Sequence, residues 1–327
     1  MRVGSCRGRL APHLTAVLDQ VQPLVYAGGA SVPDDLPGHV RAASAVRRFG
    51  SHLLVAQDDT SALAMLPVTG GAAQAVLLPV GPDGRRVFDD AIGNKRLKLD
   101  LEACAALGDG RLVVFGSGSK AARETLVLFD ERTGPTLIPA PRFYAGLRAV
   151  PAFAGSELNL EGALVRGDEL LLFQRGNGAV RAGVAPVNAV GAIDLAAFLA
   201  WLDGDHARPP PGLHAVTQLD FGAAEGCAFS VTDAALAHDG RIVLLACAEH
   251  SADAVSDGPV AGCRFAWFDG SVMELTDVLD ATGARCVLKL EGIEPRPAAQ
   301  SEFDVVIDMD RHDQPAQRGR LMVHGME

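Results

Sequence analysis

The sequence is poor in the residues on which several large functional classes depend. Two Trp and two Tyr in 327 residues offer no stacking platform for nucleic acid. A net charge of −11 also argues against a polyanion or an anionic membrane as partner. The six cysteines form no CxxC pair and have no short spacing to a His, so no zinc knuckle or redox motif is indicated. A small metal ion or a neutral or basic partner fits this composition better.

Long apolar runs and well-known catalytic motifs are also missing. The N-terminus has no apolar run of signal-peptide length, and no stretch approaches the roughly 20 apolar residues of a membrane span. We therefore expect a cytoplasmic protein. No GxSxG, HExxH or P-loop motif occurs. The hydrophobic content of 48% and the charged content of 21% are those of a globular protein with an ample core.

What the chain does contain is a repeat. The stretch Leu158–Gly178 joins a short apolar strand that carries one Glu to a charged turn and then to a fully apolar strand. Four other stretches have the same layout, and the five matching positions are Ala43, Leu101, Leu160, Thr232 and Leu290. The intervals between them are 58, 59, 72 and 58 residues. A repeat of this length, built from four short strands, is typical of a β-propeller.

The repeat predicts one all-β domain over residues 1–327, a β-propeller with five blades of four antiparallel strands. The last repeat has too few residues for four strands, so we expect an N-terminal strand near Leu24–Ala27 to complete it and close the ring. A sixth, degenerate blade in residues 1–40 is the alternative. The segment Pro12–Val21 fits either an amphipathic helix or an outer strand.

One short helix is expected, and it accounts for part of the longer third interval. Residues 194–202, DLAAFLAWL, have helical spacing of apolar residues, with Asp194 as the N-cap and Gly204 as the stop.

Acidic residues recur at one position of the repeat. In propellers the first strand of each blade lines the central channel, and the position after each matching residue holds Ser44, Glu102, Glu161, Asp233 and Glu291. Four converging acids raise one another's pKa unless positive charge compensates. Two compensations are open. Ca²⁺ would bind carboxylate oxygens, with Asn159 and Asp100 nearby, or Lys98, Arg175 and Lys289 would pair with the acids in a purely structural network.

A second group of polar residues follows the second strand of each repeat, where a propeller's channel mouth collects ligand contacts. The candidates for substrate binding are Asp58, Arg175, Asn177 and Asp308 from this group, together with Lys289, which directly precedes Leu290. Arg175 has the chemistry to clamp a carboxylate or phosphate. His250, beside Glu249, is the candidate general base. Exposed loops have the same polar composition, so the pattern also fits solvated strand ends.

The triplets Leu160-Glu161-Gly162 and Leu290-Glu291-Gly292, with the variant Leu101-Glu102-Ala103, resemble those of bacterial propellers in the phytase-like, "esterase-like activity of phytase" group. Glu161 is also similar to the channel Glu of gluconolactonase-type propellers, a resemblance that implies a Ca²⁺ site here. As an enzyme, the chain would be a Ca²⁺-dependent hydrolase of an ester, lactone or phosphoester, with the channel carboxylates holding the ion. The alternative is a monomeric propeller that binds a small molecule or a protein without turnover and keeps a structural ion-pair network in its channel.

Overall fold

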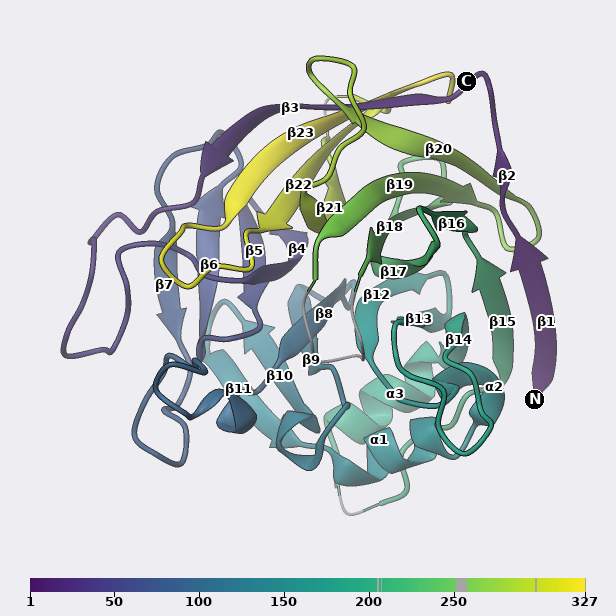
Figure 1. Ribbon diagram of the computed structural model, residues 1–327. Coiled ribbons are helices and arrows are strands. Elements are labelled where there is room, and N and C mark those ends of the chain that lie inside the picture. The colour runs from purple at the N-terminus through teal and green to yellow at the C-terminus, as the bar shows by residue number, and fades with distance from the viewer. Residues whose placement is uncertain (205, 207, 251–257, 298, 327) are drawn as a thin grey trace.

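The computed structural model describes residues 1–327 except 205, 207, 251–257, 298 and 327. Most of its regular structure is β (Figure 1). The strands of the first half are β1 (Arg2–Arg7), β2 (Arg9–Leu10), β3 (Thr15–Pro23), β4 (Ala43–Phe49), β5 (His52–Gln57), β6 (Ala62–Pro67), β7 (Gln74–Leu77), β8 (Leu101–Ala106), β9 (Arg111–Gly116), β10 (Thr125–Asp130) and β11 (Gly134–Pro139). The strands of the second half are β12 (Leu160–Arg166), β13 (Glu169–Gln174), β14 (Asn188–Asp194), β15 (Ala215–Asp220), β16 (Ala223–Ala224), β17 (Cys227–Leu236), β18 (Ile242–Glu249), β19 (Val260–Phe268), β20 (Met273–Asp280), β21 (Lys289–Pro295), β22 (Glu302–Asp308) and β23 (Gln317–His324).

Consecutive strands pair antiparallel, so each sequence repeat becomes one run of strands. Strands β4 to β7 form one sheet and β8 to β11 another, while β12 to β15 form a third with β1 added parallel to β15. Strands β17 to β20 and β21 to β23 belong to one larger sheet because β3 joins them. The hairpin between β8 and β9 has Gly108 and Gly110 at φ of 80° and 87°, positive values that glycine adopts without strain.

An N-terminal strand does complete the last repeat, but it is not the segment predicted. β3 pairs antiparallel with β23, where Leu18 faces Leu321, and parallel with β20. Leu24–Ala27 makes only isolated bridges at Val25 and Tyr26. The reason lies in the alternation of β3, whose residues Ala16 and Leu18 are buried between exposed or half-buried neighbours. Of the two interpretations of Pro12–Val21, the outer strand is confirmed.

The first strands of the repeats form a ring. β4 contacts β8, β8 contacts β12, β12 contacts β17, β17 contacts β21, and β21 contacts β4 again. Figure 1 shows these strands around the centre and the other strands of each run farther out. In the described part of the chain, a separate buried apolar cluster fills the space between each run of strands and the next. Most strands are therefore apolar on both faces, because both faces are packed.

Helices pack at one edge of this ring. α3 (Leu195–Leu202) confirms the predicted helix, and Oδ1 of Asp194 accepts a hydrogen bond from the Ala197 N–H at 2.7 Å. Two further helices, α1 (Pro141–Arg148) and α2 (Pro151–Ala154), were not predicted, although each begins with a proline. The short 3₁₀ segments are η1 (Lys95–Leu97) and η2 (Ala121–Arg123). Among the described residues, no helix has the length and apolar character needed to cross a membrane.

Candidate functional site

Each inner strand of the ring contains a β-bulge at the same place. The pairing register shifts across one residue in β4, β8, β12, β17 and β21. The bulged residues are Ser44, Glu102, Glu161, Thr232 and Glu291. A bulge leaves its residue outside the ladder and changes the direction of its side chain. The bulges therefore explain how one position of the repeat reaches the centre of the ring.

The prediction that Asp233 belongs with the other acids is wrong by one residue. The bulge of β17 falls on Thr232, and Asp233 occupies the next position. The Asp233 carboxylate accepts two hydrogen bonds from Arg47, at 2.9 and 2.8 Å, and one from the Ile293 N–H at 2.9 Å. Burial raises the pKa of Asp233, and Arg47 opposes that shift. The sequence comparison matched Thr232-Asp233 with the Leu-Glu pairs of the other repeats. In the structure the residue equivalent to those leucines is Val231, so the match was shifted by one residue.

The two neutral bulge residues fasten neighbouring inner strands. The Ser44 hydroxyl donates to the carbonyl of Leu101, and the Thr232 hydroxyl donates to that of Leu290 at 2.6 Å. Both acceptors precede the bulge of the next inner strand. The three glutamates at the same position line a cavity, which Ser44 also lines.

The glycine of the Leu-Glu-Gly triplets has a packing reason. A Cβ on Gly162 would lie 3.1 Å from the backbone N of Ala234 on the next inner strand. A Cβ on Gly292 would lie 2.9 Å from the backbone N of Val46. Glycine therefore lets successive inner strands approach closely. The triplet is explained by ring packing and does not by itself indicate an activity.

The cavity lies at the mouth of the channel and has a volume of about 40 Å³, enough for a few water-sized groups. Its acidic lining consists of Asp58, Asp100, Glu102, Glu161, Glu249, Glu291 and Asp308. Its basic lining consists of Lys95, Lys98, Arg123, Arg175 and Lys289. With all these groups ionised, negative charge exceeds positive charge by two among the described lining residues. Apart from Asp233 and His250, every predicted site residue lines this cavity, including Asn177.

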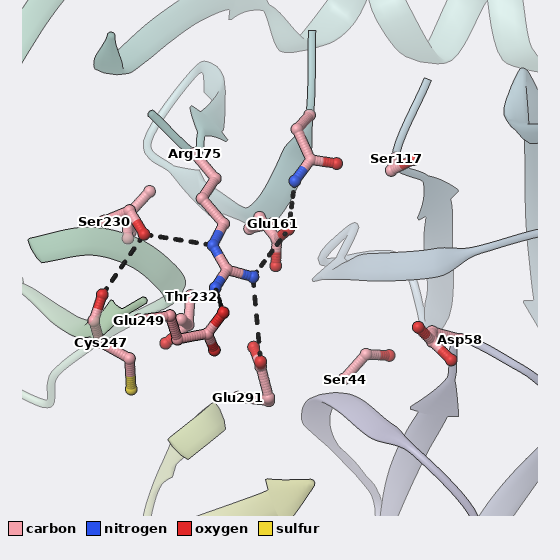
Figure 2. Close-up of polar contacts among 12 residues, drawn as sticks. Ser44, Asp58, Ser117, Glu161, Arg175, Ser230, Thr232, Cys247, Glu249 and Glu291 are labelled. Carbon is pink, nitrogen blue, oxygen red and sulfur yellow. Dashed lines mark hydrogen bonds and ion pairs between the residues drawn. The ribbon is translucent and has the colours of Figure 1, made fainter. Parts of the chain in front are cut away.

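One half of the cavity is a network of ion pairs (Figure 2). The Arg175 guanidinium lies 3.3 Å from Glu161, 3.0 Å from Glu249 and 3.9 Å from Glu291. The Lys289 ammonium lies 3.5 Å from Glu291 and 3.8 Å from Glu249. The sequence predicted that Arg175 clamps a substrate anion. In the structure Arg175 is buried, and its guanidinium pairs with glutamates of the chain itself.

Burial still dominates the protonation of these glutamates. It raises the pKa of Glu161 to about 7 against the charges of Arg175 and Lys289. Burial likewise raises the pKa of Glu291 well above its ordinary value. One oxygen of each of these two glutamates is buried with no hydrogen-bond partner among the described residues. The network thus supplies too little positive charge, or too few hydrogen-bond donors, for the oxygens of these glutamates.

The other half of the cavity contains a group of three carboxylates. One oxygen each of Asp58, Asp100 and Glu102 lies within 4.8 Å of the other two. Lys98 is 2.6 Å from both Asp58 and Asp100, and Arg123 is 2.7 Å from Asp100. Glu102 forms no hydrogen bond or ion pair with a described residue. Burial and the neighbouring acids Glu161, Asp58 and Asp100 raise its pKa well above the ordinary value.

Two larger pockets adjoin the cavity. One, of about 310 Å³, shares Asp58, Lys95 and Asp308 with it and is otherwise mainly acidic. Asp59 lines this pocket. Burial, and to a smaller extent the charge of Asp58, raises the pKa of Asp59 to about 6. The other, of about 570 Å³, shares Asn177 and Glu249 with the cavity. A ligand larger than a few waters would have to lie in these pockets.

His250, the predicted general base, lies in the larger outer pocket and does not line the central cavity. The sequence interpretation missed Arg123 and Lys95, because both come from segments between strands and lie outside the repeated pattern. It also missed the role of Thr232, since a bulge is not visible in the spacing of the repeats.

The fold and this cavity define a class, a β-propeller with a charged cavity at one end of its axis. The chain belongs to a family of unknown function (DUF6929), whose model matches residues 39–323. No curated protein matches the chain. The family description names no activity, so the phytase-like resemblance stays a prediction.

Solved structures with a similar fold are distant in sequence. A mannose phosphorylase from Leishmania mexicana is 13% identical, with 96% of this chain and 88% of the other covered and a TM-score of 0.44. A PQQ-bound aldose sugar dehydrogenase from Streptomyces coelicolor is 10% identical, with 96% and 100% covered and a TM-score of 0.43. The calcium-binding protein regucalcin from Agrobacterium tumefaciens is 11% identical, with 98% and 95% covered and a TM-score of 0.38. These scores are too low to carry an argument about the site.

Proposed function

We propose that the chain is a monomeric five-bladed propeller whose channel mouth binds one Ca²⁺ ion and, through it, a small oxygen-rich ligand. The observation that carries the proposal is the triad Asp58, Asp100 and Glu102. Oxygens that bind one Ca²⁺ at about 2.3–2.6 Å lie at most about 5 Å apart, which agrees with the spacing of the triad. Glu102 forms no ion pair with a described residue, although the charge of Lys98 opposes the rise of its pKa. A bound ion would add positive charge beside it.

The charge of the cavity supports a divalent ion. Among the described residues, and with every group ionised, the lining acids exceed the lining bases by two, the charge that one Ca²⁺ neutralises. Ca²⁺ takes six to eight oxygens, and three carboxylates supply at most six. The remaining positions are open to water or to ligand oxygens.

Such a site would support hydrolysis of an ester, lactone or phosphoester. The ion would polarise a substrate oxygen. Glu161, with a pKa of about 7, has a suitable value for a general base near neutral pH. The acidic outer pocket of about 310 Å³ favours a neutral substrate over an anionic one. A nucleic acid or membrane partner fits neither this pocket nor the net charge, and we propose the cytoplasm as the compartment.

A second candidate function is binding without turnover, and the ion pairs of Arg175 and Lys289 favour it. They already neutralise part of the acidic lining. In that case the channel acids are structural and the outer pockets alone bind the ligand.

Metal analysis together with thermal melting separates the two candidates. After EDTA treatment, Ca²⁺ should bind with a stoichiometry of one per chain and raise Tm. Glu102→Gln should abolish the binding. Glu294→Gln is the matched control, because burial raises the pKa of Glu294 as it does that of Glu102, and Glu294 lies outside the cavity. No bound metal and no change of Tm would exclude the Ca²⁺ site and leave the binding function.

A further inference from the structure

Cys227 and His250 face each other across two paired strands. In the register of β17 and β18, Phe229 is opposite Ala248 and Ser230 is opposite Cys247. Continued by two residues, the same register places Cys227 opposite His250. The Cys227 sulfur lies 2.8 Å from Nδ1 of His250. Cys227 is the first residue of β17 and His250 follows the last residue of β18, so the pairing of the two strands brings the two residues together.

A tight hairpin fixes the position of Cys227. Ala224 pairs with Cys227, and the two residues between them, Glu225 and Gly226, both have positive φ, at 51° and 84°. Two consecutive positive φ values define the turn type that matches the twist of paired strands. On the other side, the His250 N–H donates to the Pro259 carbonyl at 3.1 Å.

Both side chains line the outer pocket of about 570 Å³. Its other walls are small or polar, with Gly176, Gly178 and Ala228 beside Asn177. The Asn177 Oδ1 is buried without a hydrogen-bond partner among the described residues. The pocket thus combines a thiol, an imidazole within hydrogen-bond reach and an amide with unused bonding capacity. It offers no large apolar surface to a ligand.

We propose that Cys227 is a nucleophile, with His250 as its general base, that accepts the acyl group of a small polar ester. The sulfur bonds to the carbonyl carbon while His250 takes the thiol proton. As the ester C–O bond breaks, the proton passes from His250 to the departing alcohol. Water then hydrolyses the thioester, which releases the acid and restores the thiol. This activity is independent of the proposed Ca²⁺ site.

The other cysteines provide an internal control. All six cysteines are free, and Cys227 alone among them is not buried. The five buried ones are Cys6, Cys104, Cys247, Cys263 and Cys286. A reagent that acylates thiols should therefore mark Cys227 and leave the others unmodified in the folded protein.

The test uses p-nitrophenyl acetate and the whole chain at neutral pH. Release of p-nitrophenolate should begin with a burst of one equivalent per chain, and peptide mapping should find the acetyl group on Cys227. Cys227→Ala and Cys227→Ser should abolish the burst. His250→Asn should slow the burst at least tenfold, given the roughly 10²–10⁴-fold contribution of a general base.

Each result decides the proposal. Acylation of Cys227 no faster than that of free cysteine in the same buffer would overturn it, as would an unchanged rate in His250→Asn. Far-UV circular dichroism confirms that each variant is folded. EDTA should leave the burst intact, so failure of the Ca²⁺ site and failure of this nucleophile are told apart.

Discussion

Arg47 and Asp233, 186 residues apart in sequence, form a bidentate ion pair inside the ring, with N–O distances of 2.9 and 2.8 Å. The Arg47 guanidinium also donates to the carbonyls of Ala163 and Ile293, each at 3.0 Å, and to that of Ala234. One side chain on β4 thus holds β12, β17 and β21. Burial opposes its charge, but the charge of Asp233 outweighs burial and raises the pKa of Arg47.

We expect Arg47→Met to cost about 3–5 kcal/mol of unfolding free energy, because it leaves a buried carboxylate unpaired. Adding Asp233→Asn should recover part of the loss, so the double variant should be more stable than the sum of the single effects predicts. Urea denaturation measures both. Arg7→Met is the control, because the Arg7–Asp220 pair is exposed and should contribute at most about 1 kcal/mol. Equal losses at the two sites would contradict the role of Arg47.

The raised pKa of Glu161 predicts a loss of stability with rising pH. The unfolded chain ionises Glu161 near 4.5 and the folded chain near 7, so between these values the folded state holds more protons. Without metal, the free energy of unfolding of the wild type minus that of Glu161→Gln should fall from about pH 4.5 to 7 and then level off. Urea denaturation across this range measures the difference.

Asp100→Asn should show the opposite pH dependence of the free energy of unfolding. Burial raises the pKa of Asp100, but Lys98 and Arg123 outweigh burial and lower it below 3.8. The contribution of the Asp100 carboxylate to the free energy of unfolding is therefore complete above that value and is lost as the pH falls further.

For the Glu161 test, a difference in the free energy of unfolding between wild type and Glu161→Gln that does not change with pH would show that Glu161 titrates normally.

Lys98 predicts how the Ca²⁺ site responds to charge. Its ammonium is buried and shared between Asp58 and Asp100, where it competes with a cation for the same oxygens. Removing it should strengthen Ca²⁺ binding, so Lys98→Met should lower the Kd at least tenfold by calorimetric titration. Lys120→Met is the control, because Lys120 is absent from the lining of the cavity. Weaker binding in Lys98→Met would place the ion elsewhere.

How far the sequence could predict this protein is clear from particular residues. The spacing of the repeats predicted runs of antiparallel strands, and the sequence predicted the helix after Asp194, because apolar periodicity and capping residues act locally. The place of Asp233 was wrong because a bulge shifts register without changing composition. The pairing of Arg175 with three glutamates depends on β12, β13, β18 and β21 meeting, which no single stretch encodes.

The N-terminal strands predict two different effects of truncation. Removing residues 1–14 deletes β1 and β2, which lie on outer edges, and should lower Tm while the chain stays folded. Removing residues 1–23 also deletes β3, which exposes the edges of both β20 and β23 and removes the buried Ala16 and Leu18. This variant should be insoluble or lack a cooperative transition. Gel filtration and thermal melting compare the two, and equal behaviour would contradict the part assigned to β3.

The shared bulge separates the backbone of the ring from the chemistry of its centre. The same local geometry accepts Ser44, Thr232 or a glutamate. A hydroxyl there fastens one inner strand to the next, whereas a carboxylate adds charge to the cavity. A substitution at the bulge of one blade can therefore replace a hydrogen bond between two inner strands by a charge in the cavity, without changing the fold. The five bulges share one backbone geometry, whereas the glutamates among them are coupled through the charges of the cavity.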